Sequence, residues 1–394
     1  MQNLLWALIA LFLFAAFFQL DWAYYLVYVV GGLWIFSTWW IRRVMGRLHV
    51  LRHTPERAFV GDTVAASIEF TNASRLPLPW LYLQEGVPLE LRDTAVYRTV
   101  LGIGGRESTY HRYTLIGKKR GYYTLGPLIL RAGDPFGFID IRWQEDRPPF
   151  LIVYPQVVSL QRLGLPSRFP LGTMSRRHFF AEDPSRLAGL RPYSPGDSQR
   201  RIHWPATAHE NQLLVKTLQP SVNLPVMIAL QLQRSSYTGR SIVGSSEWAI
   251  TVAASLAVHL VRERQSVGLA SNGFDPLSGG GAVTLPSRNG QTSIMELLSL
   301  LARIQLSDGD EPVSDWLLAE STALGWGSNF ILVTPQLTGQ QLRTLHALRR
   351  RGLGAIALVC DTQPDLGVLQ AQGETLGVRV YRTVWESDLE ALAA

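Results

Sequence analysis

The stretch LPVMIALQL, residues 224–232, decides the fold of the C-terminal half of the chain. Its apolar residues are continuous rather than alternating, which is typical of a strand buried on both faces of a parallel sheet. The next segment, SEWAITVAASLAVHLVRER at 246–264, has the spacing of an amphipathic helix, and SVGLAS at 266–271 is again strand-like. A strand, a helix and a second strand in this order predict a doubly wound α/β sheet.

The same alternation continues to the C-terminus, where the last residues form a further helix. We therefore assign residues 221–394 to one α/β domain. Its other predicted helices are 291–303, 313–323 and 338–351, and its other predicted strands are 329–335, 354–360 and 378–382.

Residues 48–155 have a different pattern, with apolar and polar residues alternating over short segments. A period of two residues is typical of half-buried strands. Turn residues such as Gly104-Gly105 separate the segments, and no helix is predicted between them. Many short strands with regular turns predict a β-sandwich-like domain or a small barrel. The clearest strands are TVAASIEF (63–70), LPWLYLQE (78–85), STYHRYTL (108–115) and LIVYP (151–155).

The N-terminal residues contain two long uncharged stretches. The first covers residues 1–20 and includes an unbroken apolar run from Leu4 to Phe18, and the second extends from Trp22 to Ile41. Each has about the 20 residues that a helix needs to cross a bilayer. We therefore predict a hairpin of two transmembrane helices over residues 1–43. A cleaved signal peptide is the alternative for the first stretch, but a basic n-region and a small-x-small cleavage site are lacking.

Arginines follow the second stretch, and they set the expected orientation. The positive-inside rule places them, and both domains that follow, in the cytoplasm. We thus expect an inner-membrane protein with two spans that is in contact with the lipid bilayer. The net charge of +6 comes largely from this region, so we expect no nucleic-acid partner. The arginines are Arg42, Arg43, Arg47, Arg52 and Arg57.

Between the two soluble domains, residues 156–220 form a linking segment that contains the motif RPYSPGDSQRRIHW at 191–204. Arg191 precedes a proline, which favours extended backbone. Pro195 and Gly196 have the chemistry of a tight turn. Asp197 then stands where a helix N-cap would be, with Arg200 and Arg201 on the new helix.

Two uses of this motif compete. In the structural use, Asp197 caps a helix and pairs with an arginine, while Tyr193 and Trp204 cover guanidinium planes or fill the junction between the domains. In the catalytic use, Asp197 and His203 would act with Ser194 or Ser198, a geometry that adjacency in sequence does not provide. We favour the structural use and assign no catalytic residue. Unpaired arginines could instead bind an acidic partner or a phosphate.

The motif, written R-x-Y-x-P-G-D-x-x-R-x-I-x-W, resembles the signature of the DUF58 family of bacterial proteins. RGYYTLGPLIL (120–130), DPFGF (134–138) and ATAHENQLLVK (206–216) extend the resemblance, although Pro205 and His209 replace residues that tend to be basic. The motif positions are Arg191, Tyr193, Pro195, Gly196, Asp197, Arg200, Ile202 and Trp204.

The resemblance implies a C-terminal domain similar to von Willebrand factor A domains. It also implies partnership with a MoxR-type AAA+ ATPase, and association with a transglutaminase-like membrane protein as a further possibility. The family's role is that of an adaptor, so no reaction follows from the resemblance.

A von Willebrand A domain binds a divalent cation through D-x-S-x-S after its first strand, together with a threonine and a second aspartate. Here Gln231, Gln233 and Ser235 occupy those positions, and Arg234 adds a positive charge. Pro335-Gln336 stands where the second aspartate could have been. Divalent cations prefer charged oxygen ligands. We therefore expect a degenerate ion site, without a metal and without any other cofactor.

The sequence as a whole predicts a membrane-anchored, cytosol-facing accessory protein that works with a MoxR-type ATPase in the assembly or maturation of other proteins. The alternative is a hydrolase of cell-envelope processing that uses the motif at 191–204. A third function is a scaffold that recognises peptides on the face of the degenerate ion site.

Overall fold

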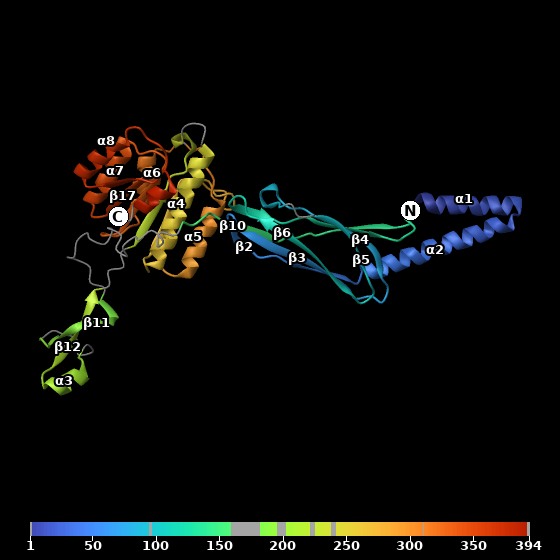
Figure 1. Ribbon diagram of the computed structural model, residues 1–394, viewed down its shortest axis with the longest axis horizontal. Helices are drawn as coiled ribbons and strands as arrows, with labels where there is room; N and C mark the ends of the chain where they lie inside the picture. The colour runs from blue at the N-terminus through green and yellow to red at the C-terminus, as the bar shows by residue number, and fades with distance from the viewer. Residues whose placement is uncertain are drawn as a thin grey trace. The chain divides into compact units, whose positions relative to one another are not determined.

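The computed structural model describes residues 2–93, 97–158, 182–194, 202–220, 225–237, 242–309 and 311–391. The chain divides into two compact units. The first comprises Met1–Gln156 with Leu301–Arg303, and the second comprises Val157–Leu300 with Ile304–Ala394. Figure 1 labels the helices and strands of both.

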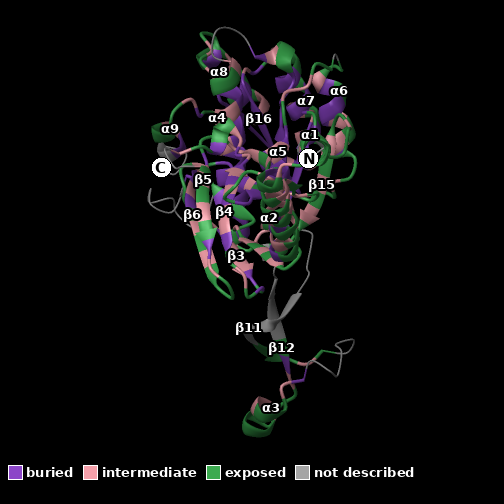
Figure 2. Cartoon of the chain, turned by 90° about the vertical axis from the view of Figure 1, so that its right-hand side faces the viewer, coloured by how far each residue is buried: buried purple, intermediate pink, exposed green. Residues whose placement is uncertain are grey.

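The first unit begins with two apolar helices, α1 (Gln2–Phe18) and α2 (Asp21–Met45). They contact each other, and the rings of Phe12 and Tyr24 meet edge to face at 5.8 Å. By length and composition α2 can cross a membrane, whereas α1, with 17 residues, is a shorter apolar helix. Most of α2 is exposed along its length (Figure 2). The structure thus confirms two apolar helices, one of which has the length of a span.

The last turn of α2 is part of the core of the domain that follows. Ile41 and Val44 are fully buried and belong to the same apolar cluster as the strands. Trp40 Nε1 donates to the carbonyl of Pro77 at 2.9 Å. The first strand begins at Leu48, so the helix enters the domain without a long linker.

Residues 48–154 form the sheet-rich domain, called here the β domain. Its sheets have the strand orders β1-β3-β6, β2-β10-β7 and β5-β4-β8-β9. Alternation along β3 and β4 buries every second side chain, as the sequence predicts. A single 3-10 turn, η1 (Leu89–Leu91), departs from the prediction of no helix. The strands are β1 (Leu48–His53), β2 (Arg57–Phe59), β3 (Thr63–Asn72), β4 (Leu78–Glu85), β5 (Arg98–Ile103), β6 (Ser108–Ile116), β7 (Gly121–Thr124), β8 (Leu128–Gly133), β9 (Asp140–Gln144) and β10 (Phe150–Tyr154).

The second unit contains a six-stranded sheet of order β15-β14-β13-β16-β17-β18. All neighbouring strands are parallel except β15, which lies antiparallel at one edge. After β13 the chain adds β14 and β15 on one side of β13, and it then adds β16, β17 and β18 on the other side. The direction of winding therefore reverses between β13 and β16, and this switch point is where doubly wound sheets bind ligands. The strands are β13 (Val226–Leu230), β14 (Val267–Ser271), β15 (Val283–Arg288), β16 (Asn329–Thr334), β17 (Gly354–Val359) and β18 (Arg379–Arg382).

Helices alternate with these strands, as predicted, with two differences. The helix expected to be amphipathic at 246–264 is buried at every position from Val252 to Val261, which is typical of a helix apolar all round. Helix α8 is absent from the prediction because Gly367 and Gly373 lower its helical propensity. The helices are α4 (Ile242–Arg262), α5 (Gln291–Arg303), α6 (Val313–Ser321), α7 (Gly339–Arg350), α8 (Leu366–Leu376) and α9 (Glu386–Ala391).

The predicted linking segment contains secondary structure of its own. Strands β11 (Glu182–Pro192) and β12 (Leu214–Pro220) pair antiparallel, and helix α3 (Trp204–Glu210) lies between them in sequence.

Candidate functional site

The two ends of the motif at 191–204 pair with the same residue of β12. Arg191 pairs with Val215, and Ile202 forms a bridge to Val215 as well. A residue in a sheet has one neighbour on each side, so the start of β12 lies between the two ends of the motif. The amide of Tyr193 donates to the carbonyl of Leu213 at 2.8 Å. Val215 and Ile202 are buried. The extended backbone predicted for Arg191 is confirmed. Both ends of the motif are held by backbone pairing with β12.

The helix after the motif begins at Trp204, and its N-cap is His203. His203 Nδ1 accepts from the amide of Ala206 at 3.1 Å, which orients the ring and occupies one of its two nitrogens. Pro205 in the first turn is compatible with a helix start. Four predicted motif residues lie outside the described part of the chain: Pro195, Gly196, Asp197 and Arg200. The cap that the structure describes is thus a histidine, a residue that the sequence prediction placed only in a catalytic role.

Apart from the buried Ile202, the described side chains of the motif are exposed or half-buried. Arg191 is exposed, and its Nη1 donates to the carbonyl of Pro192 at 3.3 Å. Tyr193 is half-buried. Trp204 is 64% exposed.

The second candidate site lies at the switch point of the parallel sheet. Leu230 pairs with Val333, so the residues that follow, Gln231 and Thr334, are neighbours at the carboxyl ends of β13 and β16. Both are buried. This is the crevice in which a doubly wound sheet presents its functional groups.

The side chain of Gln231 makes hydrogen bonds with both ends of its amide. Its Oε1 accepts from Thr334 Oγ1 at 2.7 Å and from Gln341 Nε2 at 3.0 Å. Its Nε2 donates to Ser236 Oγ at 2.5 Å. Thr334 Oγ1 also lies 2.7 Å from the carbonyl of Gln336, so its single proton is shared between two acceptors. We call Gln231, Ser236, Thr334 and Gln341 the amide cluster.

Gln341 also fixes the start of α7. It forms a capping box with Thr338, in which each side chain bonds to the other residue's backbone amide. The same amide group therefore caps a helix and holds Gln231. The spacing T-x-x-Q from Thr338 to Gln341, ahead of an apolar periodic segment, is the sequence signal of a capping box and could have identified Gln341.

The other predicted ion-site positions have separate roles. Gln233 is buried, and its Nε2 donates to the carbonyl of Gly309 at 2.5 Å. Ser235 lies on the 3-10 turn η5 (Arg234–Ser236), and it is exposed. Ser236, one residue later, provides the hydroxyl that contacts Gln231. The 3-10 turn after the strand thus brings Ser236, rather than Ser235, to Gln231.

These residues do not fit a divalent cation. Both acceptor positions of the Gln231 oxygen are occupied by hydrogen-bond donors, and an amide oxygen has no net charge. The carboxylate of Asp361, after β17, accepts from Ser245 Oγ at 2.9 Å and from its neighbour's amide. No group of three or more His, Cys, Asp or Glu that could hold a metal occurs among the described residues.

Fold and site together define a class of protein: an apolar N-terminal helix, a sheet-rich domain, and an α/β unit whose switch point carries amides instead of carboxylates. Residues 189–363 match the family model described as "Protein of unknown function DUF58", a range that includes the amide cluster and the whole motif at 191–204. This confirms the resemblance of the chain to the DUF58 family over these residues.

A relative is the "Uncharacterized protein YeaD" of Bacillus subtilis (strain 168). It is 24% identical over 322 residues, which cover 79% of this chain and 75% of the relative.

Solved structures are similar only at low scores. A CARDB domain from Pyrococcus furiosus has a TM-score of 0.20 at 11% identity, covering 27% of this chain and 86% of its own. A GH20 exo-β-N-acetylglucosaminidase from Vibrio harveyi has a TM-score of 0.19 at 12% identity, covering 88% of this chain and 75% of its own. Similarities at this level carry no argument about function.

Proposed function

We propose that the chain is a membrane-anchored accessory protein that works with a MoxR-type AAA+ ATPase in the assembly or maturation of other proteins. The amide cluster carries this proposal. In a doubly wound sheet the switch point is the usual place for a ligand or a reaction. Here Gln231, Thr334 and Gln341 fill it with hydrogen bonds to one another. A site closed in this way favours an interaction module over an enzyme.

The α/β unit is, in this proposal, a von Willebrand A-like domain with a degenerate ion site. Its support is the position of the glutamines, which follow the first parallel strand where such a domain has D-x-S-x-S. Gln231 and Gln233 are buried at two of these positions, and their side chains carry no charge. An interaction surface that does not depend on a metal is the consequence.

The proposed anchor is a hairpin of two spans with both soluble domains in the cytoplasm. Helix α2 has the length and composition of a span. Helix α1 has 17 residues, so it rises about 26 Å, close to the hydrocarbon thickness of a thin bilayer. Arg42, Arg43 and Arg47 at the end of α2 support the cytoplasmic side for the β domain.

Support for the ATPase as partner comes from the family resemblance of the motif at 191–204. The described part of the motif is held by backbone pairing with β12 through Arg191 and Ile202, and apart from Ile202 its described side chains are exposed or half-buried. Such a segment can present a fixed contact surface to another protein. A transglutaminase-like membrane protein is the second proposed partner.

The test is co-purification of the full chain from detergent-solubilised membranes of the native host. A MoxR-type ATPase should be recovered with it when ATP is present at saturating concentration. Arg191→Glu should reduce the recovery, while Arg288→Glu, on the edge strand β15, should leave it unchanged. Full recovery of the chain without any ATPase would contradict the proposal.

The alternative proposal is a hydrolase of cell-envelope processing that uses the motif. It requires His203 as general base, and in the structure Nδ1 of this residue caps α3. The cap leaves Nε2 as the ring atom that could accept a proton from a nucleophile.

A further inference from the structure

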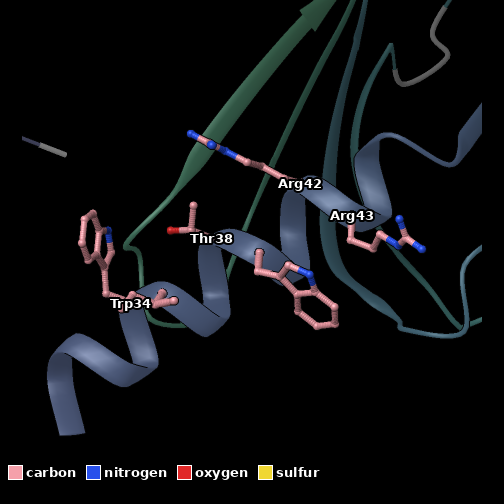
Figure 3. Close-up of a pocket in the computed structure, with 6 residues that line it drawn as sticks. Trp34, Thr38, Arg42 and Arg43 are labelled. Carbon is pink, nitrogen blue, oxygen red and sulfur yellow. The ribbon is translucent and has the colours of Figure 1, made fainter. Parts of the chain in front are cut away.

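A shallow groove of about 510 Å³ runs along the second half of α2. Figure 3 shows its side chains leaving one helix at different depths, from Trp34 to Arg43. Residues four apart lie above one another on a helix, so Trp34, Thr38 and Arg42 form one row. The full lining is Trp34, Ile35, Thr38, Trp39, Arg42 and Arg43.

The groove contains hydrogen-bond donors without acceptors. Trp34 Nε1 and Thr38 Oγ1 are buried atoms without a hydrogen-bond partner. Arg42 and Arg43 are exposed, and neither forms an ion pair within the described residues. An indole N–H and a guanidinium only donate. A matching ligand must therefore supply acceptors and negative charge near the arginines, and apolar surface near Trp34 and Ile35.

The order of these groups along the helix matches the order of groups in a phospholipid. At a rise of about 1.5 Å per residue, Thr38 lies about 6 Å and Trp34 about 12 Å below Arg42 along the axis. The arginines stand at the end of the helix next to the β domain, where a membrane interface would be. Phosphate, ester carbonyls and acyl chain come at increasing depth in a lipid leaflet.

The β domain fixes which way the groove faces. Ile41 and Val44, in the last turns of the same helix, are buried in its core. Trp40 is hydrogen-bonded to the carbonyl of Pro77. The last turns of α2 therefore cannot rotate freely, and the groove is held on the side away from the protein core.

We propose that this groove binds one anionic phospholipid. The phosphate contacts the exposed Arg42 and Arg43, and an acyl chain lies on Ile35 and the Trp34 ring. Charge complementarity selects an anionic headgroup over a zwitterionic one, because two cations at the site have no other counter-ion. The inference rests on the proposed membrane anchor.

The test uses the full chain in mild detergent, titrated with phosphatidylglycerol or with phosphatidylcholine and observed by native mass spectrometry. We expect phosphatidylglycerol to be retained at least fivefold more than phosphatidylcholine. R42Q/R43Q should abolish this preference. R47Q/R57Q removes the same charge from exposed residues outside the groove and should keep it.

Equal retention of the two lipids by the wild type, or an unchanged preference in R42Q/R43Q, would overturn the proposal. Displacement of the lipid by millimolar inorganic phosphate would overturn the assignment to a lipid. Carbonate extraction of host membranes tests the anchor separately. A chain that resists extraction but shows no lipid preference would contradict the lipid site alone, whereas a chain that is extracted would contradict both proposals.

Discussion

Gln341 donates its side-chain N–H to the side-chain oxygen of Gln231 across 3.0 Å, and both residues are buried. One stands at the end of a parallel strand, and the other caps the helix that follows the neighbouring strand. The contact joins β13 to α7, residues 110 positions apart in sequence. At the switch point of the sheet, the neutral side chains of Gln231 and Gln341 are thus held by hydrogen bonds.

Gln231→Ala should therefore destabilise the α/β unit by about 1–3 kcal/mol, because the buried Nε2 of Gln341 loses its acceptor and Thr334 Oγ1 loses one of its two. Thermal unfolding of the full chain in detergent, followed by circular dichroism, measures the effect. Ser235→Ala is the control. Since Ser235 is exposed, its change should stay within about 0.5 kcal/mol. Equal effects of the two substitutions would show that the amide cluster does not stabilise the unit.

His203→Ala should loosen α3 by about 0.5–2 kcal/mol, because it removes the N-cap. Hydrogen exchange at the amides of Ala206 and Thr207 should become faster. His203→Asn should restore protection, since asparagine is a good N-cap but cannot act as a general base. If instead His203→Asn abolished a hydrolytic activity while the amides of Ala206 and Thr207 stayed protected from exchange, the histidine would be a catalytic base. That result would support the alternative function as a hydrolase.

The β domain should be less stable at neutral than at acidic pH. Burial raises the pKa of Glu85 to about 7, although the positive charge of Arg52 opposes the shift. The folded state then binds a proton that the unfolded state releases near the ordinary value of 4.5. The free energy of unfolding should therefore fall as pH rises from about 4.5 to about 7. Glu85→Gln should remove this slope, and an unchanged slope in the variant would assign it to another group.

Arg52 lies between two carboxylates, and its removal should be more damaging than the loss of either one. It forms ion pairs with Glu85 and, at 2.5 Å, with Glu145. Arg52→Met leaves both carboxylates without their cation and should cost about 3–5 kcal/mol in denaturant unfolding. The double variant Arg52→Met/Glu85→Gln should recover part of this loss. A double variant no more stable than the single one would mean that packing, rather than charge, explains the effect.

Elements whose apolar residues recur with a clear period could be predicted from the sequence. Strand β4 begins and ends where alternation predicted, at Leu78 and Glu85. The sequence was insufficient where a turn or a distant contact determines the result. The 3-10 turn after β13 brings the hydroxyl of Ser236, and not that of Ser235, to the side chain of Gln231. Residue spacing alone does not reveal this difference. The pairing of Arg52 with Glu145 joins positions 93 residues apart, and no local pattern marks it.

The attachment of α2 to the β domain has a mechanical consequence. Met45 ends the helix and Leu48 begins β1, so only Gly46 and Arg47 separate them, while Ile41 and Val44 are already inside the domain core. A helix whose hydrophobic length differs from that of the bilayer adjusts by tilting. With no flexible hinge to absorb the tilt, the β domain must turn with the helix. For an α2 that spans the bilayer, as proposed, a change in bilayer thickness would therefore reach the β domain as a rotation.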